Sequence, residues 1–488
     1  MVDPILGVRS EATSDGRFGR IVAVPDIERH AASFRDPAGY VFEHGGRLFR
    51  AVHPDAIEDV EALFSSGLHD ELVAAGLLVA HREPEANLQL LPPGWRLLEP
   101  QRIPIISYAS EWTDAQLSAA GSLTLQLLRR ALRHGLTLKD ANTFNVQFVG
   151  SRPVFIDLLS FTRIGPNRAW PAYRQFCEHF LGPLALRRHR PAASQYHAGL
   201  TGLPMSAVSA LLPRRTWLSP GLALHIHLHA RADEAGRGRT RGVQAQAASR
   251  DVIAFQRRLA ESLAAAVEGL APPSRDSAWT GYRDNNIYSA AMADRKLQFV
   301  KEVAASTGAR RALDLGANDG HYARALASMG IACTAVELDA ACCERIYASS
   351  TAPPFDARIN TVRVDLTNPT PAHGWRHEER ASFTDRMRCD ITLALALLHH
   401  LAITHQVPFD RIAQFLGDLA PCAIVEYVPV CDPMAQQLLA ARPGLSATYL
   451  ETLSEQSFQS AFARVFDGQT RREPLDGQRV LYHFRRRC

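Results

Sequence analysis

A short segment near residue 315 carries glycines and acidic residues at a spacing that suits ligand binding. The run RRALDLGANDGHYARALASMG (310–330) reads as an apolar strand, a turn with Gly316, Asn318 and Gly320, and then an amphipathic helix. Asp314 lies in the strand just before the turn. Glycines let the backbone pass close to a ligand, and the carboxyl edge of a parallel sheet is where α/β folds bind ligands. The pattern therefore predicts a ligand-binding loop at the end of this strand.

Two further carboxylates follow the next two predicted strands. The strand CTAVELD places Glu337 at its end, and the strand TVRVDL ends with Asp365. A carboxylate at the end of the second strand can accept hydrogen bonds from both hydroxyl groups of a ribose. A carboxylate after the third strand is placed to accept the amino hydrogens of adenine. Together with the glycine loop, these residues predict a sheet that binds a nucleoside.

A pair of histidines follows the fourth predicted strand. This strand, CDITLALALLHHL, ends in His399 and His400, and a fifth strand, CAIVEYVPV, carries Glu426 and Tyr427. The ordinary pKa of histidine is about 6.5, so a histidine at the ligand edge can take a proton near neutral pH. Either histidine is therefore a candidate general base. The alternative is that one caps a helix and the other lines the wall of the site.

Together these residues resemble the class I S-adenosylmethionine-dependent methyltransferases over roughly residues 280–488. The loop of that family, D-x-G-x-x-x-G, holds the methionine end of the cofactor, and Asp314, Gly316 and Gly320 match it. The resemblance implies that Glu337 holds the ribose and Asp365 the adenine. It also implies a Rossmann-like α/β domain with a seven-stranded sheet, S-adenosylmethionine as cofactor, and a methyl acceptor whose identity the sequence does not reveal.

The match departs from the family at one position, and a rival class needs to be weighed. Asn318 stands where the family most often has a third glycine, which leaves the shape of the loop open. Trp279, Tyr282 and Tyr288 resemble segments that cover the cofactor, and simple packing is the alternative. A dinucleotide dehydrogenase is disfavoured because the loop reads D-L-G-A-N-D-G instead of G-x-G-x-x-G, and because Asp365 and an LLHHL element follow.

A second group of polar residues lies in the N-terminal half, within HGLTLKDANTFNVQFVGSRPVFIDLLSF (134–161). Asp140 and Asn145 are followed by Asp157 at the end of a strand. This layout resembles protein kinases and aminoglycoside phosphotransferases, which place a base Asp, a metal-binding Asn and a metal-binding Asp in this order. The resemblance implies an α+β kinase-like domain. The alternative is that Asp140 and Asn145 only order a turn.

This resemblance lacks the kinase lysine. No lysine precedes Lys139, so none is available for the nucleotide phosphates. Arg50 could substitute for it only with a guanidinium group, which is larger than the lysine ammonium and not equivalent to it. No G-x-G-x-x-G loop is present in this half. The sequence therefore predicts a pseudokinase and argues against Mg-ATP as a ligand. Asp140 would be catalytic, and Asn145 and Asp157 would hold magnesium, only if this domain were active.

The whole chain divides into four predicted parts. They are a polar leader (1–38), a kinase-like domain (39–230), a flexible linker or helix (231–274) and the methyltransferase domain (275–488). The runs LKDANTFNVQF, PVFIDLLSF, YRQFCEHFLGPLAL and VEYVPVCDPM also resemble a bacterial family of large methyltransferases grouped by similarity to a rhizobial host-specific nodulation protein.

Within HIHLH (225–229), three alternating histidines would share one face of a strand, which we interpret as a polar face and not as a metal site.

Composition limits the setting in which this protein works. Its 488 residues are 46% hydrophobic with a formal net charge of +4, so a concentrated basic face is not indicated and nucleic acid is disfavoured as a partner. We find no secretory signal and no run long enough to span a membrane, which predicts a cytoplasmic protein. The sequence does not indicate an oligomeric state.

Three functional hypotheses follow from the two resemblances. In the first, the protein transfers a methyl group from S-adenosylmethionine, and the kinase-like domain recruits or positions the acceptor. In the second, the kinase-like domain is an active ATP-dependent phosphotransferase and the protein is bifunctional. In the third, the protein is a non-catalytic adaptor that only senses the cofactor.

Overall fold

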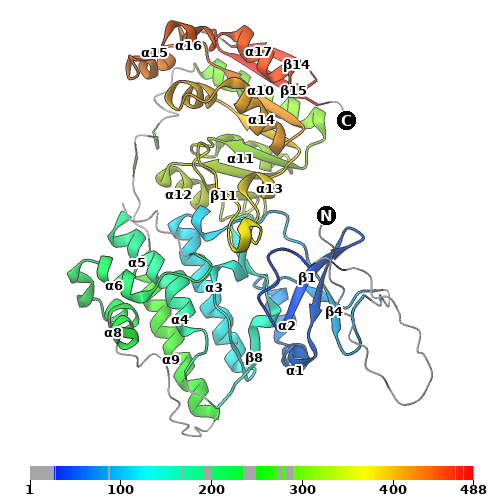
Figure 1. Ribbon diagram of the computed structural model, residues 1–488, viewed down its shortest axis with the longest axis vertical. Helices are drawn as coiled ribbons and strands as arrows, with labels where there is room; N and C mark the ends of the chain where they lie inside the picture. Colours follow the sequence, from blue (N-terminus) through cyan, green and yellow to red (C-terminus); the bar gives the residue numbers. More distant parts are fainter. Residues whose placement is uncertain are drawn as a thin grey trace, which may run out of the picture.

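The computed structural model shows two halves stacked along its long axis (Figure 1). It describes residues 27, 29–85, 88, 90–166, 169–191, 199–234, 249–271, 276–277, 279–281, 289–467, 469–475 and 478–486. Most of the predicted leader, the linker residues 235–248, and Tyr282 and Tyr288 lie outside these ranges. None of the helices in the described ranges is long and apolar enough to cross a bilayer.

The N-terminal half begins with a small antiparallel sheet. Its first two strands form a hairpin: Gly39 pairs with Val52, and the turn contains Gly45 and Gly46, whose φ angles are +58° and +74°. Glycine is the residue that adopts such angles at no steric cost. The strand order is β1-β2-β4-β3, with two helices beside it. The bounds are β1 (Gly39–His44), β2 (Arg47–Val52), α1 (Ile57–Ser65), α2 (Leu68–Ala74), β3 (His81–Arg82) and β4 (Arg96–Pro100).

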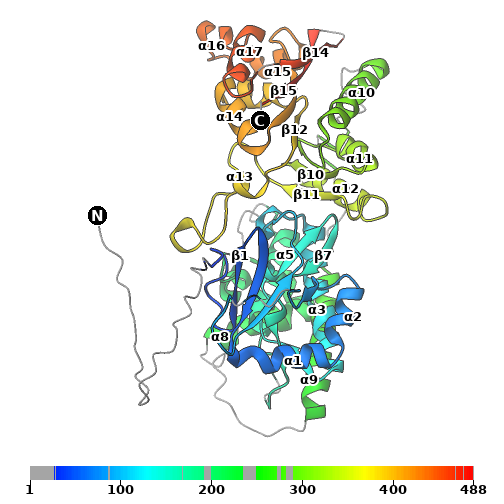
Figure 2. The ribbon, with the colours of Figure 1, turned by 90° about the vertical axis from the view of Figure 1, so that its right-hand side faces the viewer.

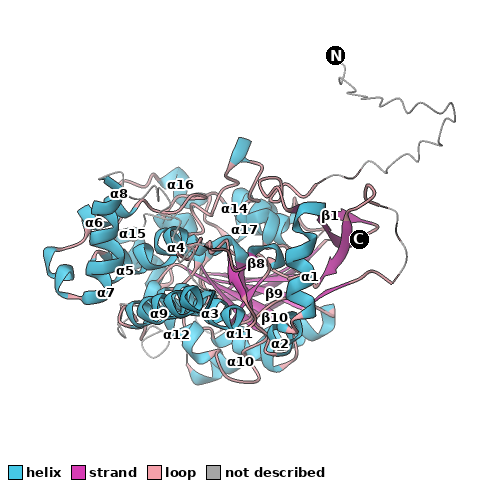
Figure 3. Ribbon diagram, turned by 90° about the horizontal axis from the view of Figure 1, so that it is seen from below, coloured by secondary structure: helices cyan, strands magenta, loops and turns pink. Residues whose placement is uncertain are grey.

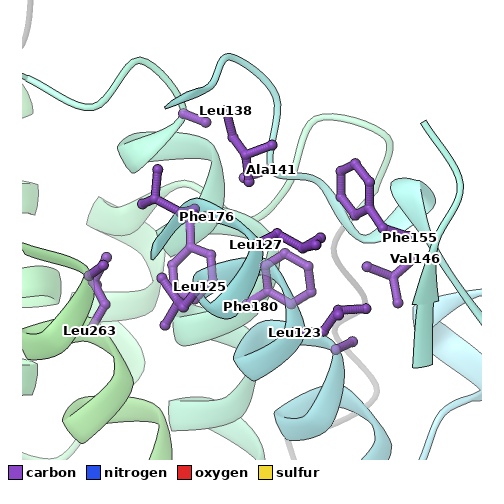
Figure 4. Packing of buried hydrophobic residues seen from close by; sticks show 14 of the residues in the cluster. Leu123, Leu125, Leu127, Leu138, Ala141, Val146, Phe155, Phe176, Phe180 and Leu263 are labelled. Carbon is purple, nitrogen blue, oxygen red and sulfur yellow. The ribbon is translucent and has the colours of Figure 1, made fainter. Parts of the chain in front are cut away.

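A long helix, α3 (Asp114–Arg133), is the core of the second lobe of this half. Thr113 and Gln116 cap its first turn reciprocally, and Gly135 follows its end with φ +73°. α3 packs along α9 (Ser249–Glu268), which lies in the predicted linker region (Figure 3). Figure 4 shows α3 leucines beside Phe180 and Leu263, all buried in one apolar cluster.

The remaining elements of this half are short. Two antiparallel strand pairs, β5 with β8 and β6 with β7, flank the predicted kinase-like residues. Their bounds and those of the other helices are β5 (Leu136–Leu138), β6 (Val146–Val149), β7 (Arg152–Phe155), β8 (Phe161–Arg163), α4 (Tyr173–Phe176), α5 (Gly182–His189), α6 (Met205–Leu211), α7 (Pro220–Leu222) and α8 (His229–Glu234).

The HIHLH run is helical, so the strand expected there was wrong. His225 and His227 lie in a π-helical segment, η8 (Ala223–Leu228). The His225 ring contacts Tyr173 Oη at 3.0 Å and Ser262 Oγ at 2.8 Å, and the two ring nitrogens of His227 each lie 2.8 Å from a hydroxyl oxygen. These histidines are satisfied by neighbouring helices, a tertiary context that a three-residue alternation does not reveal.

The C-terminal half is built on a mixed seven-stranded sheet. Its order is β11-β10-β9-β12-β13-β15-β14, and β15 runs antiparallel to β13. Helices cover both faces (Figure 2), and the apolar side chains of each face form a separate core cluster. This is the Rossmann-like seven-stranded sheet that the resemblance implied. The strands are β9 (Arg311–Leu315), β10 (Ala332–Glu337), β11 (Ile359–Arg363), β12 (Ile391–Ala394), β13 (Cys422–Tyr427), β14 (Gln469–Pro474) and β15 (Val480–Arg485).

The helices of this half begin before the sheet and continue to its last hairpin. Ser289 caps the first of them through the backbone N–H of Met292, and Gly308 follows its end with φ +65°. Their bounds are α10 (Ala290–Thr307), α11 (His321–Ser328), α12 (Ala340–Ser349), α13 (Phe383–Arg386), α14 (Phe409–Leu419), α15 (Pro433–Ala440), α16 (Ala447–Glu451) and α17 (Glu455–Ala463).

The N-terminal half covers the open edge of the large sheet. Gln116 Nε2 donates to the backbone oxygen of Thr361 on the edge strand β11, 3.1 Å away. Glu344 of α12 accepts hydrogen bonds from the first backbone N–H groups of α3, at 2.7 and 3.2 Å. Arg386 and Glu111 form an ion pair at 2.5 Å with side chains 5% and 1% exposed. The halves are therefore joined by buried polar contacts and not by a linker alone.

We expect the pair of Arg386 and Glu111 to be essential for this junction. Glu111→Ala leaves a buried guanidinium without its counter-ion and should lower the free energy of unfolding by about 3 kcal/mol. Arg102→Ala breaks an exposed pair with Glu43 and should cost less than about 1 kcal/mol. Urea denaturation of both variants tests the expectation, and equal losses would contradict it.

Candidate functional site

The predicted glycine loop lies between β9 and α11 and uses left-handed backbone conformations. Gly316 and Gly320 have φ angles of +71° and +77°, and Asn318 has φ +50°. A Cβ atom at Gly316 would lie 3.3 Å from Leu397 Cδ1, so the loop passes close to its neighbours. Asparagine is among the few residues that tolerate the left-handed region, which explains how Asn318 replaces the family glycine.

Glu337 ties this loop to the neighbouring strand. Its Oε2 accepts the backbone N–H of Asn318 at 2.8 Å, and its Oε1 accepts the N–H groups of Leu338 and Asp339 at 2.7 and 2.8 Å. Each carboxylate oxygen has two lone pairs, so Oε2 keeps one for a further donor. The carboxylate thus stands at the carboxyl edge, beside the glycine loop.

Asp365 lies at the same edge, one strand further along. β10 and β11 are parallel neighbours, and the backbone N–H of Val364 donates to the backbone oxygen of Glu337 at 2.9 Å. Asp365 Oδ1 accepts hydrogen bonds from the backbone and the hydroxyl of Thr367 at 2.9 and 2.6 Å. The structure therefore brings together the three predicted strand ends at one edge of the sheet.

Asp314 lies beneath the loop and is 2% exposed. Its Oδ2 accepts the backbone N–H of Ala323 at 3.2 Å, which links β9 to the first turn of α11. Burial raises the pKa of Asp314 to about 7, because the charged carboxylate loses its hydration. The group therefore changes its charge near neutral pH, and a cation bound at the loop would favour the ionised form.

Trp279 and the two histidines border the loop. Asn318 Nδ2 donates to the backbone oxygen of Trp279 at 3.0 Å, and the Trp279 ring meets the His400 ring edge to face at 5.6 Å. The rings of His399 and His400 lie 4.2 Å apart. Burial lowers the pKa of His399 to about 3 and also lowers that of His400, so both are neutral at pH 7. Within the described chain, neither ring nitrogen of the 3% exposed His399 has a hydrogen-bond partner.

A buried cluster of four charges next to the histidines escaped the sequence analysis. Lys296 Nζ lies 2.6 Å from Glu426 Oε2, and Arg479 Nη1 lies 3.5 Å from Glu426 Oε1. Arg479 also forms a bidentate salt bridge with Asp432, in which Nε and Nη2 donate to the two carboxylate oxygens at 2.7 and 2.9 Å. All four residues are at most 3% exposed. The rarity of lysine, with only Lys139, Lys296 and Lys301 in the chain, was the one available signal.

This charge cluster holds the segment after β12. Glu426 Oε2 accepts the backbone N–H of Ala396 at 2.9 Å, and Ala396 has φ +51°, a conformation that costs a non-glycine residue about 1 kcal/mol or more. The next residue, Leu397, is the one that approaches Gly316. Strain of this kind persists where surrounding contacts enforce it. The segment that leads to His399 is thereby fixed between the charge cluster and the glycine loop.

The kinase-like residues are also brought together, and Arg50 joins them. Arg50 Nη1 lies 2.8 Å from Asp157 Oδ1, with the side chains 10% and 14% exposed. Ser160 Oγ donates to Asp157 Oδ2 at 2.6 Å and accepts from Asn145 Nδ2 at 3.1 Å. Arg50 thus reaches the second acidic residue of the pattern, and that carboxylate is engaged on both oxygens.

Asp140 lies in the same cluster but is held by its own loop. Asn142 Nδ2 donates to both Asp140 oxygens, at 2.8 and 3.0 Å. Burial, and then the charge of Asp157, raises the pKa of Asp140. Among the described residues no three His, Cys, Asp or Glu side chains are arranged to hold a metal ion.

The sheet order, the glycine loop and the acidic strand ends define the C-terminal half as a class I methyltransferase domain. The chain belongs to the family of the nodulation protein NoeA. It is 34% identical to NoeA of Rhizobium meliloti (strain 1021) over 485 residues, which cover 96% of this chain and 98% of NoeA. No family model matches the chain.

Two solved structures are similar at low identity. The bifunctional kinase-methyltransferase WbdD is 14% identical, with 42% of this chain and 41% of that chain covered and a TM-score of 0.29. The N-methyltransferase NodS from Bradyrhizobium japonicum WM9 is 11% identical, with 41% and 98% covered and a TM-score of 0.30.

The raised pKa of Asp314 gives a pH-dependent stability. Between its ordinary value near 4 and about pH 7, the folded protein binds the proton more tightly than the unfolded chain does. This contribution is complete below pH 4 and is lost as pH rises to 7, by about 4 kcal/mol at about 1.4 kcal/mol per unit. Asp314→Asn should remove that slope from urea unfolding between pH 4.5 and 7.5, whereas exposed Asp418→Asn should keep it. The same slope in wild type and Asp314→Asn would contradict the assignment.

Proposed function

We propose that this methyltransferase takes its methyl group from S-adenosylmethionine, bound at the carboxyl edge of β9, β10 and β11. The observation that carries the proposal is the hydrogen bond from Asn318 N–H to Glu337, which joins the glycine loop to the acidic end of β10. The residues fit the cofactor chemically. Gly316 and Gly320 allow a close-packed loop in which a Cβ would lie within 3.3 Å of Leu397 or Ile346, and carboxylates stand where hydroxyl and amino donors would arrive.

In this proposal each residue of the edge has a defined role. Glu337 accepts a hydrogen bond from a ribose hydroxyl with the lone pair of Oε2 that the loop leaves free. Asp365, next along the edge, accepts the adenine amino hydrogens. The glycine loop lines the methionine end, and Asp314 beneath it supplies negative charge when ionised. The cofactor itself supplies a methyl group already activated by a sulfonium, so alignment carries most of the rate acceleration.

We further propose that the histidine pair serves the acceptor. A base is required only if the acceptor must lose a proton. His400 is the less buried of the two and stays neutral at pH 7, so its ring can accept that proton. His399 has two buried ring nitrogens without partners and can form a hydrogen bond to the acceptor. The charge cluster around Glu426 keeps both rings in place through Ala396.

The kinase-like domain, in this proposal, recruits or positions the acceptor. The support is the ion pair of Arg50 and Asp157, because it engages the carboxylate that an active kinase uses for magnesium. The assembled residues Asp140, Asn145 and Asp157 keep a phosphotransferase as the second candidate. Turnover of labelled ATP by the wild type that is lost in Asp157→Ala would favour this second candidate.

The cofactor assignment is tested by calorimetric titration with S-adenosylhomocysteine. We expect one-to-one binding by the wild type. Glu337→Ala should weaken it by about 1–3 kcal/mol, the scale of a lost charged hydrogen bond. Glu378→Ala, an exposed glutamate on the same half, is the matched control and should bind like the wild type. No binding by the wild type would overturn the proposal, and ATP with magnesium would then be the next ligand to test.

Methyl transfer itself is tested with methyl-labelled S-adenosylmethionine and cell extracts. We expect the wild type to label an acceptor. His400→Ala should label it about 10²–10⁴ times more slowly, the range for loss of a general base, with S-adenosylhomocysteine affinity unchanged. The exposed histidine His405 provides the control His405→Ala. Tight cofactor binding with no labelled product from any extract would instead favour a cofactor-sensing adaptor.

A further inference from the structure

A cavity of about 640 Å³ opens at the amino edge of the large sheet, opposite the glycine loop. Arg310 and Arg311 line it at the start of β9, and Arg485 and Arg486 line it at the end of β15. The two pairs meet because β15 is antiparallel to its neighbour: Arg485 lies opposite Cys422, the first residue of β13. The glycine loop begins after Leu315, so β9 has this cavity at one end and the predicted cofactor site at the other.

The cavity carries a net positive charge. Its four arginines and its single carboxylate, Asp390, give a formal charge of +3. Asp390 Oδ2 accepts the backbone N–H groups of Arg310 and Arg311 at 2.9 and 2.8 Å. The carboxylate therefore fixes the backbone from which these two side chains project and forms no salt bridge with any of the four guanidinium groups.

Some exposed arginines elsewhere, such as Arg82 and Arg102, lie within 3.3 Å of a glutamate oxygen. By contrast, the side chains of Arg310, Arg311 and Arg485 are exposed and form no ion pair with any residue that the structure describes. Like charges that converge in a concave site repel one another, and a bound anion relieves that repulsion.

We propose that this cavity is a second ligand site, separate from methyl transfer, that binds a phosphate-bearing small molecule. Guanidinium groups present planar pairs of donors that match phosphate oxygens, and bonds between ionised partners are the stronger ones. The volume falls within the roughly 300–1,000 Å³ of small-molecule sites. Arg486 is anchored by its Nε bond to Val465 O at 3.2 Å, which leaves Arg310, Arg311 and Arg485 to reach the ligand.

The test uses the full chain and inorganic pyrophosphate as the probe. Calorimetric titration at about 0.15 M salt should show one-to-one binding. Arg311→Ala/Arg485→Ala should weaken it about tenfold or more, as expected for the loss of two charged hydrogen-bonding groups. The charge-matched control Arg82→Ala/Arg102→Ala should bind like the wild type, and saturating S-adenosylhomocysteine should not displace the probe.

Three results would overturn the proposal. They are no pyrophosphate binding by the wild type, equal weakening in the control variant, and displacement of the probe by S-adenosylhomocysteine. If the alanine variant does not fold, the variant Arg311→Lys/Arg485→Lys can be tested in its place. It keeps both positive charges but loses the planar pairs of guanidinium donors. Unchanged pyrophosphate affinity in this variant would contradict the recognition that we propose. Binding of duplex DNA or anionic vesicles through these arginines, without pyrophosphate binding, would replace the small molecule with a macromolecular partner.

Discussion

The candidate cofactor site depends on the bond between the backbone of Asn318 and the carboxylate of Glu337. Because β9 and β10 are parallel neighbours, their carboxyl ends arrive at the same edge, and this bond joins the loop of one to the acidic end of the other. Asp365 follows one strand further on by the same geometry. A parallel sheet therefore brings residues that are distant in the sequence together at one edge.

The charge cluster of Lys296, Glu426, Asp432 and Arg479 is the costly part of this half. Removing four charges from water is repaid only by close pairing, and apolar residues of similar volume are often as stable. The cluster has one visible effect on the site: Glu426 keeps Ala396 in a left-handed conformation. We regard the cluster as part of the acceptor side of the site for that reason, since it fixes the segment between the glycine loop and the histidines.

The two halves are linked through the edge of the sheet and through the segment that follows Asp365. Gln116, Glu344 and the buried pair of Arg386 and Glu111 connect α3 and its preceding segment to α12, β11 and α13. The kinase-like domain thereby covers an exposed edge strand, which in other proteins is a site of unwanted pairing. The positive cavity lies at the amino ends of β9 and β13, away from the carboxyl ends that carry the glycine loop.

Local patterns of strand, turn and helix around Gly316, Glu337 and Asp365 are sufficient to predict the class of the C-terminal fold, its glycine loop and the acidic strand ends. The sequence also indicated the kinase-like loop and the missing lysine. The folded chain alone reveals that Arg50 pairs with Asp157, that Lys296 meets Glu426, and that four arginines meet at one cavity. These partners lie about 100 or more residues apart, and burial and pairing between such segments depend on the packed fold, which no local spacing records.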